Sequence, residues 1–276
     1  MAKRAFLIIG TLSALALTTG LSARTGTPTA KTELAAAVAA PTRTATNVER
    51  DKYRHPAETL AFFGVKPTDK VVEIWPGGGW YTEILAPYLA EKGQLTIVAP
   101  SGKPSEGIAK KLDASPAAYG KVLRANFPSN LGGTPVAPGS ADVVLTFRNV
   151  HNWRMGYLTA DKADYSEAAF REIYAMLKPG GVLGIEDHRL PENMDTAREA
   201  SSGYIKVSTI KALAAKAGFQ FAGESQVNAN ARDTHDYPKG VWTLPPTFAE
   251  KDADRAKYAA IGESDRMTLR FVKPRK

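Results

Sequence analysis

Residues 71–81 read VVEIWPGGGWY, which combines an apolar run, an acidic residue, a proline and three glycines. Apolar side chains then recur at helical spacing, at Ile84, Leu85, Tyr88 and Leu89. This order predicts a strand, a tight glycine turn and a helix. Glycines let the backbone approach a ligand because they carry no Cβ atom, and the start of the helix offers unpaired N–H groups with a partial positive charge. We therefore expect a ligand-binding turn at the carboxyl end of a strand in an α/β sheet.

Strand and helix patterns alternate along the rest of the chain. Residues 141–147 predict a buried strand, and residues 165–177 predict a helix with one apolar face. The alternation predicts a mostly parallel sheet with helices on both faces, in one domain. A long polar insertion at 228–264 precedes the last strand. The other predicted strands are 70–75, 93–100, 122–125, 182–186, 219–225 and 266–272, and the other predicted helices are 57–64, 79–91, 105–113 and 209–217.

The composition is that of an ordinary globular protein, with 276 residues, 43% hydrophobic and 23% charged. A chain of this length can bury a full core. The lack of cysteine excludes disulfides, thiolate nucleophiles and cysteine-ligated metals. The formal net charge is +8, but the basic residues are scattered apart from a short tail at 273–276. Because no basic stripe is interleaved with aromatic residues, we expect no nucleic-acid partner.

The N-terminus has the pattern of a secretory signal. Lys3 and Arg4 precede an uncharged apolar stretch, and small residues follow through Ala23. The apolar stretch is short for a membrane span, although an uncleaved N-terminal anchor is the alternative. We expect a signal peptide over 1–23, cleaved after Ala23 or later in the Ala-rich 34–40, a disordered leader over 24–47 and one domain over 48–276. The mature protein is then exported, to the periplasm in a bacterium, with no stable membrane anchor.

Four features follow one another in a recognisable order. They are the acid-and-glycine turn at 71–80, the strand and Asn/His segment at 141–153, the Leu-Lys-Pro-Gly-Gly turn at 177–181, and the closing helix, strand, insertion and strand. Together they resemble class I S-adenosylmethionine-dependent methyltransferases, and most closely predicted exported bacterial proteins of this superfamily. The resemblance covers about residues 53–272. It implies a doubly wound, seven-stranded Rossmann-like sheet with an insertion between its last two strands, and methyl transfer to a small-molecule acceptor.

The resemblance also implies that S-adenosylmethionine is the cofactor. Its methionine part would lie against the turn formed by Gly77, Gly78 and Gly79 beside Trp80. Glu73 would help to hold its amino group.

Asn126 follows the third strand, where family members often place an acid against the adenine, and Asn149 would lie beside the sulfonium. Two positions depart from the family pattern. Ala99-Pro100 stands where an acid usually accepts hydrogen bonds from the ribose hydroxyls, and Pro76 removes one N–H donor from the turn. An exported, non-enzymatic ligand-binding protein that kept the fold but lost the cofactor therefore stays open as an alternative.

Polar side chains follow the fourth and fifth predicted strands: His151 follows the fourth, and Asp187 and His188 follow the fifth. Because the carboxyl ends of parallel strands open on the same edge as the glycine turn, these side chains should meet there. A base assists methyl transfer to a hydroxyl or amine, so we expect His151 to be the general base, with Asp187 or His188 orienting it or the substrate. Alternatively, these residues and His235 bind zinc or iron in a metal-assisted enzyme, but no close His-x-His spacing supports this and we assign no metal ligand.

Three further residues are expected to contact the acceptor. His55 precedes the helix that covers the cofactor site in the family. Arg148 is suited to pairing with a carboxylate or to stacking, with a salt bridge to a nearby carboxylate such as Glu186 as the alternative. Trp153 would wall a pocket for an aromatic or apolar acceptor, whereas we expect Trp75 to pack in the core.

Overall fold

The computed structural model describes residue 1 and residues 29–275. The strands are β1 (Lys70–Ile74), β2 (Gln94–Ala99), β3 (Leu123–Asn126), β4 (Ala141–Phe147), β5 (Leu177–Leu190), β6 (Ile205–Lys206), β7 (Gln220–Ser225) and β8 (Arg266–Val272). They form one sheet in the order β3-β2-β1-β4-β5-β8-β7, with the short β6 beside β5. The predicted doubly wound, mostly parallel sheet is confirmed, with β6 as an addition to its seven main strands.

The direction of the strands explains where a site can form. Strands β1 to β5 pair in parallel, whereas β8 is antiparallel to both β5 and β7. The parallel strands therefore end at one edge of the sheet. The glycine turn follows β1 there, and the segment from Arg148 to His151 follows β4. Ligand sites of open α/β sheets form at this edge.

The apolar runs of the central strands are buried on both faces. Val71 of β1 and Val143 of β4 face one core, whereas their neighbours Val72 and Val144 face the other. Successive side chains of a strand point to opposite faces. A strand covered on both sides therefore has a continuous apolar run instead of an alternating one.

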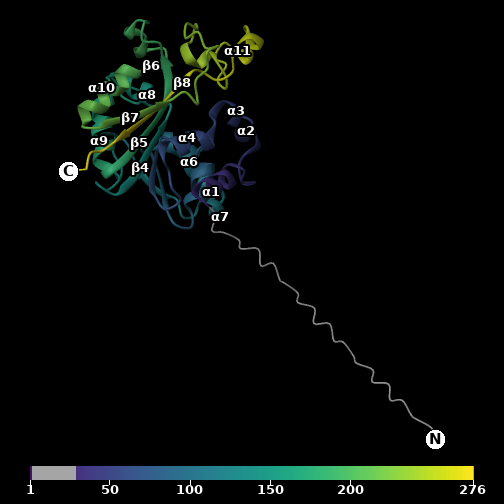
Figure 1. Ribbon diagram of the computed structural model, residues 1–276. Helices are drawn as coiled ribbons and strands as arrows, with labels where there is room; N and C mark the ends of the chain where they lie inside the picture. Colours follow the sequence, from purple (N-terminus) through teal and green to yellow (C-terminus); the bar gives the residue numbers. More distant parts are fainter. Residues whose placement is uncertain (2–28, 276) are drawn as a thin grey trace.

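Two groups of helices cover the two faces (Figure 1). One face packs against α9 (Ser166–Met176) and α10 (Val207–Ala217), and the other against α4 (Pro56–Phe63), α5 (Thr82–Leu89) and α6 (Lys103–Ala114). The described chain also contains α1 (Ala30–Val38), α2 (Ala45–Val48), α3 (Asp51–Arg54), α7 (Pro116–Tyr119), α8 (Val150–Arg154), α11 (Arg255–Ile261) and the 3-10 turns η1 (Ser129–Leu131), η2 (Thr196–Ala200) and η3 (Gly240–Thr243).

Helix α1 corrects the prediction of a disordered leader up to residue 47. Thr29 caps this helix by accepting a hydrogen bond from the Thr32 N–H, and Leu34 and Ala37 are buried in the core formed with α5. A short Ala-rich stretch has weak periodicity, and its stability comes mostly from packing. The predicted signal peptide lies outside the described residues, apart from Met1. Within the described part of the chain, no helix is long and apolar enough to cross a membrane.

Strand β5 is longer than the predicted 182–186, and Asp187 and His188 lie inside it. The extension follows from the antiparallel neighbour, because Asp187 pairs with Met267 and His188 with Arg266 of β8. Sequence patterns of β5 alone do not reveal how far a partner strand continues. The two polar residues are therefore held by a ladder of backbone hydrogen bonds.

The chain between β7 and β8 folds back onto the carboxyl edge of the sheet. Asn228 donates hydrogen bonds of 2.9 Å to the hydroxyls of Thr59 and Thr268. Further along, the ring of Trp242 lies 6.3 Å from the ring of His151. This segment thus contributes a wall to the cavities described next.

Candidate functional site

Three adjoining cavities lie at the carboxyl edge of the sheet. The turn cavity, of about 210 Å³, is lined by the glycine turn and by Glu73. The apolar cavity, of about 580 Å³, extends from Trp75 to the end of β2. The arginine cavity, of about 280 Å³, is lined by His151 and by arginines that also line the turn cavity. The turn and apolar cavities share Asn149, and the apolar and arginine cavities share Trp242, so the three cavities adjoin one another.

The turn exposes its backbone at two of its three glycines. Gly77 and Gly78 are exposed, and a Cβ atom on either would meet nothing within 4 Å. Gly79 is buried with φ +80°, and a Cβ atom there would lie 2.9 Å from Cδ1 of Ile108. The prediction that Gly79 faces the cofactor is therefore wrong: Gly77 and Gly78 line the cavity, and Gly79 lets α6 pack against the turn.

Glu73 lies under the turn, in β1. Its side chain is buried, lines the turn cavity and accepts a hydrogen bond from the Thr82 hydroxyl at 2.7 Å. Burial raises the pKa of Glu73 to about 7, and the hydrogen bond from Thr82 offsets part of this rise. A buried carboxyl group of this kind gains its charge most easily when a cation binds beside it. This is the environment expected for a group that holds the amino end of the cofactor.

Trp75 and Trp153, two tryptophans near this edge, lie in surroundings that differ from those we predicted. Trp75 is half-buried and lines both the turn and apolar cavities, although we expected it in the core. Trp153 is fully buried, with its ring 5.4 Å from Phe127, so the prediction that it contacts the substrate is wrong. The reason is that Val150 and Trp153 lie one turn apart on α8 and both face the core. Trp80 lines the turn cavity.

Asn126 does not line any of the three cavities. Its Nδ2 donates to the Ala99 carbonyl at 3.2 Å, and its Oδ1 accepts from the Thr134 N–H at 2.9 Å. Both ends of the amide therefore hold a loop, and the structure does not bring Asn126 to the cavities where we expected it to meet adenine. Asn149 does line the turn and apolar cavities, and its Nδ2 donates to the Ile74 carbonyl at 2.9 Å. This bond joins the ends of β1 and β4 and leaves the Asn149 carbonyl oxygen for a ligand.

The apolar cavity occupies the place where the resemblance puts the adenosine. Its walls include Trp75, Ile108 and Tyr157, which suit a flat ring. No carboxylate is among its lining residues, in agreement with the missing acid at Ala99-Pro100. The polar side chains that line it and could meet ribose hydroxyls include the amides of Asn149 and Asn152 and the hydroxyl of Tyr157.

His151 and Asp187 form a buried hydrogen-bonded pair. The distance from His151 Nδ1 to Asp187 Oδ1 is 2.6 Å, and the His151 N–H donates to Oδ2 at 3.2 Å. Since Nδ1 is used by the carboxylate, Nε2 is the ring nitrogen left for a ligand in the arginine cavity. The His188 ring lies 5.0 Å from that of His151, and its Nδ1 contacts the Ser264 hydroxyl. Burial, and next the charges of His151 and nearby arginines, lowers the pKa of His188 well below its ordinary value.

These three side chains also match the spacing of a metal site. In the described part of the chain, ligand atoms of His151, Asp187 and His188 lie within 4.8 Å of one another. His235, the fourth ligand of the metal hypothesis, lies apart with its Nε2 3.6 Å from Asp265. Asp187 is already bonded to His151, and the positive charges of nearby arginines oppose a further cation. The arrangement therefore suits an acid–base pair better than a metal centre.

Arg148 lies between the turn and arginine cavities, near the place that we predicted for a substrate contact. Its backbone has φ +61°, an uncommon conformation for a residue with a side chain. Its Nη1 is 3.9 Å from Glu263 instead of pairing with the Glu186 side chain. Arg148 therefore reaches a carboxylate that is distant in sequence.

His55 is the other predicted acceptor contact that the structure places elsewhere. It joins α3 to α4 with φ +41° and is not among the residues that line the three cavities. The resemblance located the helix that follows His55 correctly. It did not determine the direction of the His55 side chain, which is why the predicted contact differs from the structure.

The sequence analysis missed Arg50, Arg54, Glu263 and Trp242, all of which line the arginine cavity. One signal was present: Arg50 and Arg54 are four residues apart, and two like charges at this spacing are unfavourable on an isolated helix. Such a pair suggests a nearby anion. Glu263 and Trp242 lie in the insertion and carried no comparable signal.

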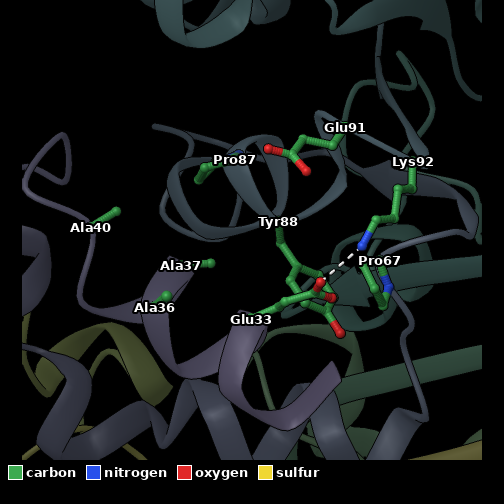
Figure 2. Close-up of a pocket in the computed structure, with 9 residues that line it drawn as sticks. All are labelled: Glu33, Ala36, Ala37, Ala40, Pro67, Pro87, Tyr88, Glu91 and Lys92. Carbon is green, nitrogen blue, oxygen red and sulfur yellow. Dashed lines mark hydrogen bonds and ion pairs between the residues drawn. The ribbon is translucent and has the colours of Figure 1, made fainter. Parts of the chain in front are cut away.

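A further cavity of about 370 Å³ lies between α1 and α5 (Figure 2). It shares no lining residue with the three cavities above. Of its charged lining residues Glu33, Glu91 and Lys92, the first and last form an ion pair of 2.9 Å. This cavity is therefore separate from the candidate site.

Comparison with known proteins relates the central part of the chain to methyltransferases. The methyltransferase domain family matches residues 72–185, which include the glycine turn and His151 but end before Asp187. No curated protein matches the chain. The family match thus covers the part of the chain that forms the glycine turn and strands β1 to β4, and the solved structures described next share the fold.

Solved structures resemble the chain in fold at low identity. A SAM-dependent methyltransferase from Aquifex aeolicus has 14% identity and a TM-score of 0.55, covering 82% of this chain and 93% of its own. A putative sarcosine dimethylglycine methyltransferase from Galdieria sulphuraria has 16% identity and a TM-score of 0.56, covering 84% and 87%. The cyclase SpnF has 14% identity and a TM-score of 0.56, covering 90% and 97%. Because one of these neighbours is a cyclase, the fold does not determine the reaction, which has to be inferred from the residues of the site.

Proposed function

We propose that this chain transfers a methyl group from S-adenosylmethionine to a hydroxyl or amine of a small-molecule acceptor, with His151 as the general base. The observation that carries the proposal is the His151–Asp187 pair, since His151 lines the arginine cavity, which adjoins the cavity at the open glycine turn. When bound, S-adenosylmethionine supplies an activated methyl group on a sulfonium sulfur. The protein then mainly has to position the acceptor, take its proton and exclude water.

The residues present fit this cofactor. The backbone of Gly77 and Gly78 is open for the methionine part, and the carboxyl group of Glu73 is placed for its amino end. The apolar cavity beside Trp75 and Ile108 suits adenine. The missing ribose acid was the reason for the alternative of a non-enzymatic binding protein. The site nevertheless retains a base and an open turn, so we do not propose that alternative.

His151 would accept the acceptor proton at Nε2. Asp187 holds the opposite ring nitrogen at 2.6 Å, which orients the ring and stabilises its protonated form. The low pKa of His188 keeps that residue neutral, which makes it suited to hydrogen bonding and poorly suited to pairing with an anion. This division of roles supports one base, at His151.

Isothermal titration of the full chain with S-adenosylmethionine and with S-adenosylhomocysteine tests the proposal. We expect saturable binding of both. The variant Glu73→Gln should bind more weakly, whereas Glu106→Gln, a matched change at an exposed residue of α6, should bind as the wild type does. No binding at millimolar ligand would contradict the proposal.

We also propose that the protein acts after export. The support is the signal-like pattern of residues 1–23. Cleavage after Ala23 keeps α1 whole, whereas cleavage within 34–40 would remove the buried Leu34 side chain from the core. Fractionation of the source cells with N-terminal sequencing of the mature chain checks this: a start just after Ala23 is expected, and an intact chain in the cytosol would contradict it.

A further inference from the structure

Three arginines that line both the turn and arginine cavities share a single carboxylate. Arg50 Nε lies 2.6 Å from Glu263 Oε1, Arg54 Nε lies 3.0 Å from Oε2, and Arg148 Nη1 lies 3.9 Å from Oε2. One negative charge therefore faces three positive charges at the boundary of the two cavities.

The neighbouring carboxylates do not neutralise this excess of positive charge. Glu186 Oε1 lies 2.8 Å from Nε of Arg266, a fourth buried arginine that also contacts Glu263. Asp187 is bonded to His151. Pairing Glu186 with Arg266 and Asp187 with His151 leaves Glu263 alone to compensate Arg50, Arg54 and Arg148.

The same arginines have buried nitrogens without a hydrogen-bond partner among the described residues. These are Nη2 of Arg50, Nη1 of Arg54 and Nη1 of Arg148. The Arg54 side chain is only 2% exposed. Burial, and next the charge of Arg148, holds the pKa of Arg54 well below its ordinary value. A buried donor or charge without a partner is unfavourable, and a bound anion would satisfy both.

The rest of the arginine cavity determines what kind of anion fits. Besides the arginines it is lined by Val241, Trp242, Pro245 and Pro246, all from the insertion. His151 also lines this cavity, and its ring lies 6.3 Å from the ring of Trp242. A ligand with an anionic group and an apolar or aromatic body would therefore meet guanidinium groups at one end and apolar surface along its length.

We propose that Arg54 and Arg148 bind the anionic group of the methyl acceptor, which is a small organic acid with a carboxylate or phosphate and an apolar body. The identification of this ligand as the acceptor rests on the proposed function, since it places the ligand beside His151. Binding of the anion itself does not depend on methyl transfer. Arg50, on the same side, adds positive charge to the site.

Calorimetric titration of the full chain with inorganic phosphate, with benzoate and with benzamide tests the proposal. Benzoate and benzamide have nearly the same shape and differ in charge. We expect phosphate and benzoate to bind and benzamide to bind much more weakly. Arg148→Gln should weaken benzoate binding about tenfold or more. The matched control Arg124→Gln changes an exposed arginine paired with Asp113 and should leave benzoate binding unchanged.

Each titration is repeated with saturating S-adenosylhomocysteine, which separates the acceptor from the cofactor's own carboxylate. Benzoate binding that persists supports the proposal, whereas loss of benzoate binding assigns the arginines to the cofactor and overturns it. No binding of either anion, or equal binding by Arg148→Gln, also overturns it, provided that thermal unfolding shows the variant to be folded. Anion binding without S-adenosylmethionine binding would instead remove the proposed methyl transfer and keep the anion site.

Discussion

The imidazole of His151 is held by the carboxylate of Asp187, with 2.6 Å between Nδ1 and Oδ1, although the residues are 36 positions apart. His151 lies in the first turn of α8, the helix after β4, and Asp187 lies within β5, the next strand in the sheet. The pair thus depends on the parallel register of two neighbouring strands. Because both side chains are buried, water competes little for their hydrogen bond.

We expect Asp187→Asn to lower kcat by about 10²–10⁴-fold, because the amide neither stabilises protonated His151 nor fixes its tautomer. The measurement is the initial rate of S-adenosylhomocysteine formation as a function of pH, with the acceptor identified from the anionic class above. Asp142→Asn is the control, since Asp142 pairs with Lys178 at the opposite edge of the sheet. A rate and pH profile in Asp187→Asn equal to those of the control would remove Asp187 from the mechanism.

The raised pKa of Glu73 predicts that the contribution of this residue to stability falls as the pH rises from about 4.5 to about 7. In this window the unfolded chain has lost the proton that the folded chain still holds, so unfolding releases a proton and is favoured by higher pH. The shift corresponds to on the order of 3 kcal/mol in the free energy of unfolding. His188, whose pKa is lowered by burial, contributes a slope of the opposite sign in both proteins. Urea denaturation across this range should therefore show that the stability of the wild type relative to Glu73→Gln falls as the pH rises. An identical slope in both proteins would contradict the assignment.

Cofactor affinity should also depend on whether the Glu73 carboxyl group carries its proton. If ionised Glu73 pairs with the cofactor amino group, affinity falls as the pH drops below about 7, approaching tenfold per pH unit. Calorimetry with S-adenosylhomocysteine between about pH 5.5 and 8 measures this, and Glu73→Gln should be nearly flat over the same range. A wild-type affinity that does not change with pH would separate Glu73 from the amino group.

The glycine turn predicts two different outcomes for one kind of substitution. Gly78→Ala adds a methyl group to an exposed position of the turn cavity, so cofactor affinity should fall while stability stays within about 0.5 kcal/mol of the wild type. Gly79→Ala puts a side chain at φ +80° and close to Ile108, so stability should fall by about 1–2 kcal/mol. Thermal unfolding and calorimetry on both variants check the contrast. Equal effects on stability would contradict it.

Asn126 and Asn149 make a second matched pair. Asn126→Ala should lower stability by about 1 kcal/mol and leave cofactor affinity unchanged, because its amide bonds only to Ala99 and Thr134. Asn149→Ala should lower both stability and cofactor affinity, because the Asn149 side chain joins the ends of β1 and β4 and also lines two cavities. Weaker cofactor binding by Asn126→Ala would reinstate the adenine contact that the structure argues against.

Local patterns predicted much of the architecture. The helix at 57–64 was expected because Pro56 suits a first turn and Gly64 an end, and α4 runs from Pro56 to Phe63 with Gly64 at φ +76°. The apolar strand at 141–147 matches β4 in both bounds. Such features depend on neighbours within a few residues, whose periodicity and backbone preferences are visible in the chain itself. Helix α1 escaped prediction because its stability comes from packing against α5.

The turn at 71–81 and the meeting of His151 with Asp187 at one edge of the sheet followed from chain order and the superfamily resemblance. Tertiary structure alone decided that Trp153 is buried while Trp75 lines the cavities, because helix rotation sets which face meets the core. It also decided that Arg54 meets Glu263, 209 residues away. Contacts at that separation depend on how the insertion folds across the sheet edge, and no local preference of either residue encodes them.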